Sequence, residues 1–109
     1  MSQESKIDDL RIRLAKALTW LDIPGVSTEQ LNKLQTKSYN ARGFYTGPES
    51  SLVNALNISS RALNHIQNAP ENYDLHEHIH DLQFGVNNIE SCLKVISPSR
   101  IDAISNDLR

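Results

Sequence analysis

The sequence lacks the features that mark secreted and membrane-spanning proteins. Its 109 residues include one cysteine, Cys92, which excludes an internal disulfide and is typical of a reducing compartment. No apolar run approaches the length that a bilayer requires. The polar N-terminal segment also lacks the apolar stretch of a signal peptide. We therefore expect a cytoplasmic protein that does not associate with membranes.

Sequence motifs for catalysis are missing as well. There is no GxxxxGK[ST] phosphate loop and no HExxH zinc motif, and Cys92 has no histidine near it in the sequence. Without a nucleophile–base pair, a metal set or a phosphate loop, the sequence gives no support for catalysis. We predict a non-enzymatic protein that needs no cofactor, in which Cys92 is a small buried thiol.

Aromatic residues and net charge are both scarce. Aromatics make up 6% of the chain and hydrophobic residues 39%, so the core must consist mostly of leucine, isoleucine, valine and alanine. The charged fraction of 22% is typical of a folded domain. A net charge of −2 and a pI of about 6.0 argue against a protein that binds duplex nucleic acid. We expect a single domain over residues 1–109.

Helical periodicity is what the sequence does contain. Within residues 75–96, apolar residues recur with gaps of 4, 3, 4, 3, 4 and 3, which places one apolar seam along a single helix. The seam consists of Leu75, Ile79, Leu82, Val86, Ile89, Leu93 and Ile96. We predict that the other helices, or a second copy of the chain, cover this seam.

Other segments repeat the helical pattern, and none alternates in the manner of a β-strand. Ser27-x-x-Gln30 and Asp74-x-x-Glu77 are both candidate capping boxes for helix starts. The predicted fold is all-α: an antiparallel bundle or hairpin of four helices plus a short C-terminal helix. The predicted helices span about 4–22, 28–42, 48–67, 71–96 and 99–108.

A cluster of cations, aromatic rings and glycines precedes the predicted helix at Pro48. Cations with aromatic platforms are how proteins hold single-stranded or small nucleotides, and a helix N-terminus favours an anion. The predicted anion- or nucleotide-binding residues are Lys33, Lys37, Arg42, Tyr45 and Arg61. The alternative is an ordinary interhelical loop in which Phe44 and Tyr45 cap the core.

The predicted fourth helix is acidic. Residues 70–96 contain one lysine against five acidic residues, a net charge of −4. Phe84 lies nearly opposite the seam, so the first helix, the fifth helix or another subunit must cover it. The predicted partner-binding residues are Glu77, Asp81, Phe84 and Glu90. We expect a homo-oligomer, since so small a chain carries so long a seam.

His76 and His80 are four residues apart and share a helix face, a spacing that can chelate Zn²⁺. Two ligands do not complete a site, so Asp81 or a residue from another chain would have to join them. The alternative is a solvated, pH-sensitive first turn of an acidic helix.

The run Asp81-Leu82-Gln83-Phe84-Gly85 lies in a helix that ends near Ser97-Pro98, and Tyr45 to Pro48 precede the helix before it. In these features residues 45–98 resemble the phage anti-CBASS sponge family, which are small helical-hairpin oligomers. The resemblance implies sequestration of cyclic oligonucleotides. The family follows the run with an Arg-Ala pair, whereas this chain has Ser91-Cys92-Leu93 and no cation there.

Three functions follow as expectations. The first is a small, self-associating helical protein that inhibits or docks on another protein, as an immunity or anti-defence factor does. The second is a sponge that sequesters cyclic oligonucleotides. The third is a metal-binding helical protein built on His76 and His80.

Overall fold

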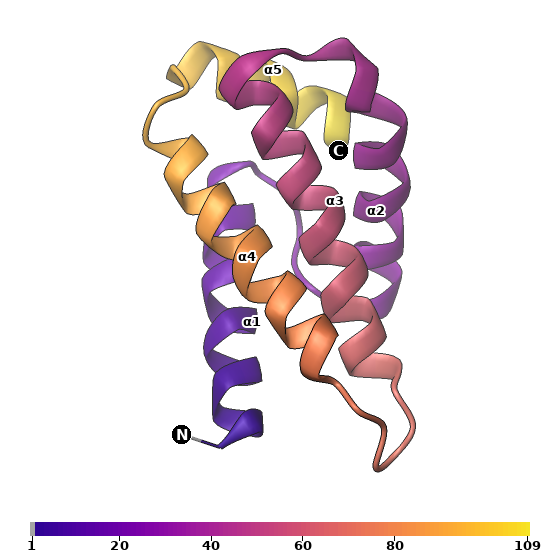
Figure 1. Ribbon diagram of the computed structural model, residues 1–109. Helices are drawn as coiled ribbons and strands as arrows, with labels where there is room; N and C mark the ends of the chain where they lie inside the picture. The colour runs from indigo at the N-terminus through magenta and orange to yellow at the C-terminus, as the bar shows by residue number, and fades with distance from the viewer. Residues whose placement is uncertain (1) are drawn as a thin grey trace.

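The computed structural model describes residues 2–109, and within that range it contains helices and no strand (Figure 1). The predicted all-α fold is therefore confirmed. The α-helices are α1 Gln3–Trp20, α2 Thr28–Ala41, α3 Gly47–Asn68, α4 His76–Leu93 and α5 Pro98–Leu108, and a short 3-10 helix, η1, spans Arg42–Phe44. Among residues 2–109, no helix combines the length and the apolarity needed to cross a membrane.

The helix α3 lies between α2 and α4 and runs antiparallel to both (Figure 1). The helix α1 packs beside α4 and runs in the same direction, so the four long helices do not alternate in direction as predicted. The segment 21–27 causes this difference. It contains buried Ile23 and partly buried Val26, which pack against the core while the chain returns along the bundle. The last helix, α5, crosses the end where α3 begins (Figure 1).

The end of α1 comes two residues earlier than predicted because Asp22 adopts a left-handed conformation, with φ of 57°. The N–H of Asp22 donates to the carbonyl of Thr19 at 3.1 Å, and the N–H of Ile23 donates to that of Leu18 at 2.9 Å. This pair of bonds is the Schellman motif, usually built on glycine. Pro24 follows and prevents the helix from resuming.

The apolar seam is largely buried, as predicted: Ile79, Leu82, Val86, Ile89 and Ile96 are buried, and Leu75 and Leu93 are partly buried. Val86 and Ile89 are 0% exposed, and α1 and α3 cover them. The core around them is aliphatic: its buried hydrophobic members are leucine, isoleucine, valine, alanine and Cys92. Burial raises the pKa of the Cys92 thiol, which fits the small buried thiol expected from the sequence.

The helix α4 is shorter than the predicted 71–96 at both ends. Asn72, with φ of 67°, and a turn from Pro70 to Tyr73 keep the chain non-helical before Leu75. The predicted capping box at Asp74 is absent, because Leu75 occupies the cap position and Asp74 instead accepts the N–H of His76 at 3.0 Å. The capping box at Ser27 and Gln30 is present, with both reciprocal hydrogen bonds.

Candidate functional site

A hollow of about 460 Å³ opens between α2, α3 and α4 and contains two arginines and two aromatic rings. Its volume lies within the range of small-molecule sites, which runs from about 300 to 1,000 Å³. We call it the Arg–aromatic hollow. Its lining residues are Tyr39, Arg42, Ser51, Asn54, Ala55, Asn57, Ile58, Arg61, Phe84 and Asn88.

Helical spacing brings these side chains together. Tyr39 in the last turn of α2 and Arg42 at the start of η1 are three residues apart, and Phe84 and Asn88 are four apart on α4. Such pairs share a helix face. The floor comes from α3, where Asn57 donates to the carbonyl of Gln35 at 2.9 Å and so ties α3 to α2.

The two arginines are held differently. The guanidinium of Arg42 lies 3.7 Å from the centre of the Tyr39 ring, and its Nε donates to the carbonyl of Tyr39 at 3.2 Å. Arg61 is exposed, and within residues 2–109 its side chain forms no ion pair or hydrogen bond. Arg42 is therefore oriented in advance, whereas the five donors of Arg61 remain available to an anion.

Phe84 is 57% exposed, and neither α1 nor α5 contributes to the hollow around it. The sequence had suggested that the first helix, the fifth helix or another subunit covers this ring, and neither of the two helices does so. Asn88 lies one turn further along α4 and donates from its side chain to the carbonyl of Phe84 at 2.8 Å. The ring thus stands at the edge of the hollow, where a planar ligand can stack on it.

The other predicted anion-binding residues lie elsewhere. Lys33 lines a separate hollow that also contains Asp22 and Glu29. The Lys37 amine donates to the main-chain oxygen of Arg109. The structure therefore brings together Arg42 and Arg61 but separates both from Lys33 and Lys37.

Tyr45 has a structural role in this arrangement. Its hydroxyl donates to the carboxylate of Asp107 and so links the segment after η1 to α5. Burial, with the hydrogen bond to Asp107 adding to it, raises the pKa of Tyr45 to about 12. The alternative in which Phe44 and Tyr45 both cap the core is half right, because Tyr45 packs against it while Phe44 is 84% exposed.

The predicted acidic surface of α4 is divided. Glu77 and Asp81 are exposed, but Glu90 accepts two hydrogen bonds from Arg13 of α1, at 2.6 Å and 3.1 Å. Arg13, opposed by burial, lowers the pKa of Glu90. Glu90 is therefore a link between helices, and Glu77, Asp81 and Phe84 remain as the exposed group, which we call the acidic face.

The histidines do not converge on one point. His76 and His80 are exposed at the start of α4, and His80 Nδ1 lies 4.0 Å from Asp81. His78 instead stacks on His65 of α3, with ring centres 4.8 Å apart. Over the described range 2–109, no three histidine, cysteine or acidic side chains are placed to hold one metal ion.

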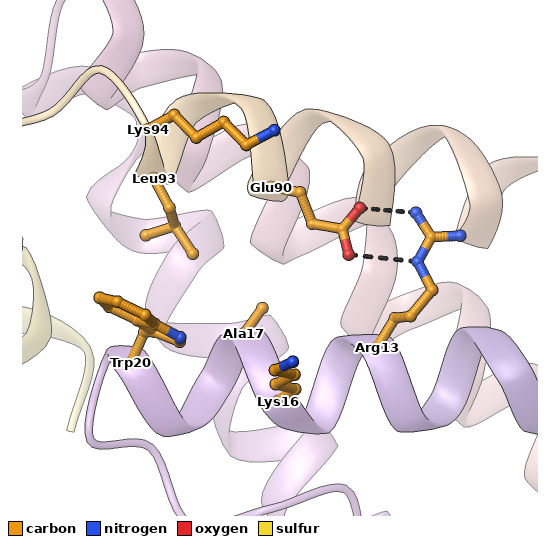
Figure 2. Close-up of a pocket in the computed structure, with 7 residues that line it drawn as sticks. All are labelled: Arg13, Lys16, Ala17, Trp20, Glu90, Leu93 and Lys94. Carbon is orange, nitrogen blue, oxygen red and sulfur yellow. Dashed lines mark hydrogen bonds and ion pairs between the residues drawn. The ribbon is translucent and has the colours of Figure 1, made fainter.

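A second surface feature, which the sequence did not indicate, is a groove of about 430 Å³ between α1 and α4. We call it the α1–α4 groove. Figure 2 shows Trp20 and Leu93 facing each other across it, beside the double hydrogen bond of Arg13 and Glu90. It is lined by Arg13, Lys16, Ala17, Trp20, Glu90, Leu93 and Lys94.

Sequence reasoning overlooked Asn54, Ile58 and Asn88 in the hollow, and Lys16 and Trp20 in the groove. Helical phase is the signal that could have found the members of the hollow that lie on α3. Asn54, Ile58 and Arg61 follow the spacing i, i+4, i+7 and must share one face of their helix.

Comparison with protein-family models, curated proteins and solved structures gave no match to this chain.

Proposed function

We propose that this chain is a non-enzymatic binding protein that acts by holding another molecule on its exposed aromatic residues. One observation carries the proposal. The chain has one tryptophan, three tyrosines and two phenylalanines, and all except Tyr45 are exposed. Aromatic rings usually supply core packing, whereas here the core is aliphatic. Aromatic and arginine side chains are the residue types enriched at binding surfaces.

The ligand that best fits the Arg–aromatic hollow is a small phosphate-bearing molecule with flat rings. Arg61 supplies unpaired donors that suit a phosphate, which guanidinium groups bind in a bidentate manner. Tyr39 and Phe84 supply ring faces on which a base stacks. A cyclic oligonucleotide, the ligand implied by the sponge resemblance, has both parts. Holding it would make this chain a sequestering, anti-defence type of protein.

The test is thermal unfolding with a panel of cyclic dinucleotides and trinucleotides. A ligand at 100 times its Kd adds about 2.7 kcal/mol to the free energy of unfolding, which raises the Tm of a small domain by about 10 °C. The Arg61→Gln variant should reduce this rise. The control variant Lys6→Gln removes an equal charge from exposed helix surface and should retain it.

Two results would contradict the nucleotide proposal or its place in the hollow. If no member of the panel raises the Tm, the nucleotide proposal is wrong. If Arg61→Gln and Lys6→Gln respond alike to a stabilising nucleotide, that ligand binds outside the Arg–aromatic hollow.

A protein partner is the second candidate, and the acidic face favours it. Glu77 and Asp81 are exposed one turn apart, with the Phe84 ring a turn further along α4. Carboxylates around an aromatic anchor suit a basic protein surface. The double charge reversal Glu77→Lys/Asp81→Lys should abolish capture of a basic protein from the native host. If the variant captures the basic protein as well as the wild type does, the acidic face is not the binding surface for that partner.

A further inference from the structure

The α1–α4 groove combines an apolar floor with excess positive charge. Trp20, Ala17 and Leu93 form the floor, and Trp20 is 70% exposed (Figure 2). A tryptophan this exposed beside an apolar floor is typical of contact surfaces, where it acts as a binding anchor.

The charges of the groove do not balance. Its lining contains three cationic side chains and one carboxylate, Glu90, which leaves two positive charges. Arg13 is engaged by Glu90, whereas Lys16 and Lys94 form no ion pair within residues 2–109. Both lysines nevertheless help to lower the pKa of Glu90, so they lie close to the same carboxylate. Although the chain has a net charge of −2, the groove is locally positive and therefore favours an acidic partner.

The chain itself carries a surface of the complementary kind. On the acidic face, Glu77, Asp81 and Phe84 follow the spacing i, i+4, i+7, so two carboxylates and a ring lie along one exposed side of α4. Two carboxylates match the two unpaired lysines, and the Phe84 ring matches the floor around Trp20.

We infer that the α1–α4 groove of one copy binds the acidic face of a second copy, so that copies associate head to tail. A single copy cannot satisfy its own groove, because Glu77 and Lys94 are 17 positions apart on the α4 segment, about 25 Å at helical rise. The two surfaces differ, so the contact is heterologous, and an open assembly retains one free groove at one end and one free face at the other until a ring closes.

This inference does not rest on the Arg–aromatic hollow. Association of copies nevertheless affects the hollow. Phe84 belongs to both surfaces, so association places the hollow beside the neighbouring copy.

Charge exchange tests the inference directly. Analytical ultracentrifugation of the wild type at low salt should show a mass that rises with concentration above the 12.3 kDa of one chain. The groove variant Lys16→Glu/Lys94→Glu should weaken association at least about tenfold, because it sets like charges against each other. The face variant Glu77→Lys/Asp81→Lys should do the same. A chain with all four substitutions should regain association, since its charges are complementary again.

Control measurements separate this contact from general charge effects. Lys33→Glu changes an exposed lysine on α2, outside both surfaces, and should leave association unchanged. Raising the ionic strength from about 0.05 M to about 0.5 M should weaken association, because exposed charges are screened. Helical circular dichroism verifies that each variant folds. A wild type that stays monomeric at about 1 mM, or a four-fold variant that does not regain association, would overturn the inference.

Discussion

At the scale of single residues, Gly85 determines how closely α4 approaches α3. A Cβ built on Gly85 would lie 2.1 Å from the hydroxyl of Ser59 and 3.2 Å from the carbonyl of Ala55. From the sequence, Gly85 is only a weak point in a helix, costing about 1 kcal/mol relative to alanine. In the structure that cost is offset by a contact that no larger residue allows.

The Gly85→Ala variant should therefore lose stability. The crowding costs about 2 kcal/mol, which outweighs the gain of about 1 kcal/mol in helix propensity. Ser59→Ala alone should be neutral or slightly stabilising, because the buried Ser59 hydroxyl has no hydrogen-bond partner. Combined with Ser59→Ala, the glycine substitution should cost less. Urea unfolding of the four proteins measures this coupling, and additive losses would contradict the proposed clash.

Residue-scale roles were only partly predictable from the sequence. Arg42 and Arg61 were candidates because charge is visible in a sequence, and the structure places both in the Arg–aromatic hollow, where their binding role stays a prediction. Lys37 and Tyr39, however, are two positions apart and so lie on opposite sides of a helix. Grouping residues by proximity in sequence therefore merged surfaces that helical phase separates. The role of Tyr45 depends on Asp107, 62 residues away, which no local pattern reveals.

At the scale of elements, the link between α1 and α4 is polar at its edge. Arg13 donates to both carboxylate oxygens of Glu90 and also to the side-chain oxygen of Asn87 at 2.8 Å. This bidentate bond ties α1 to α4 at the edge of their contact. The only covalent connection from α1 to α2 is the extended segment 21–27.

The Glu90→Gln variant should lose stability in a pH-dependent way. Because the pKa of folded Glu90 is below its ordinary value of 4.5, the carboxylate stabilises the fold above about pH 4.5. That contribution is lost as the pH falls through the folded pKa. At pH 7 the expected loss is about 1 kcal/mol or less, since the pair is partly exposed.

A double-mutant cycle with Arg13→Gln isolates this pair. In that background, Glu90→Gln should cost almost nothing further. Chemical unfolding at pH 7 and at pH 3 provides the measurement. A loss that persists unchanged at pH 3 would mean that Glu90 acts by packing and not by charge.

Element-scale features divide in the same manner between local and distant causes. The existence and type of the five helices, and the burial of most of the α4 seam, follow from periodicity together with local capping and proline signals. The direction of α1 does not, because it depends on whether the segment 21–27 turns tightly or packs along the core. The burial of Ile23 shows that the segment packs along the core. A single apolar residue in a loop sequence does not predict this packing.

At the scale of the whole molecule, aliphatic residues form the interior, and the aromatic residues other than Tyr45 lie outside. The proposed roles follow from that division: rings and arginines in the Arg–aromatic hollow hold a ligand, and Trp20 in the α1–α4 groove contacts a second copy. Neither surface could be assembled from the sequence, since each draws residues from helices whose relative rotation is set by packing.

The most direct measurement of the central claim is a nitrogen–proton NMR titration of the labelled protein with the cyclic nucleotide that stabilises it best. The account predicts that the shifting amides cluster at Tyr39, Arg42, Arg61, Phe84 and Asn88, with Arg61→Gln weakening the affinity. Shifts centred on Lys33 or on the α1–α4 groove, or no shifts with any nucleotide of the panel, would contradict it.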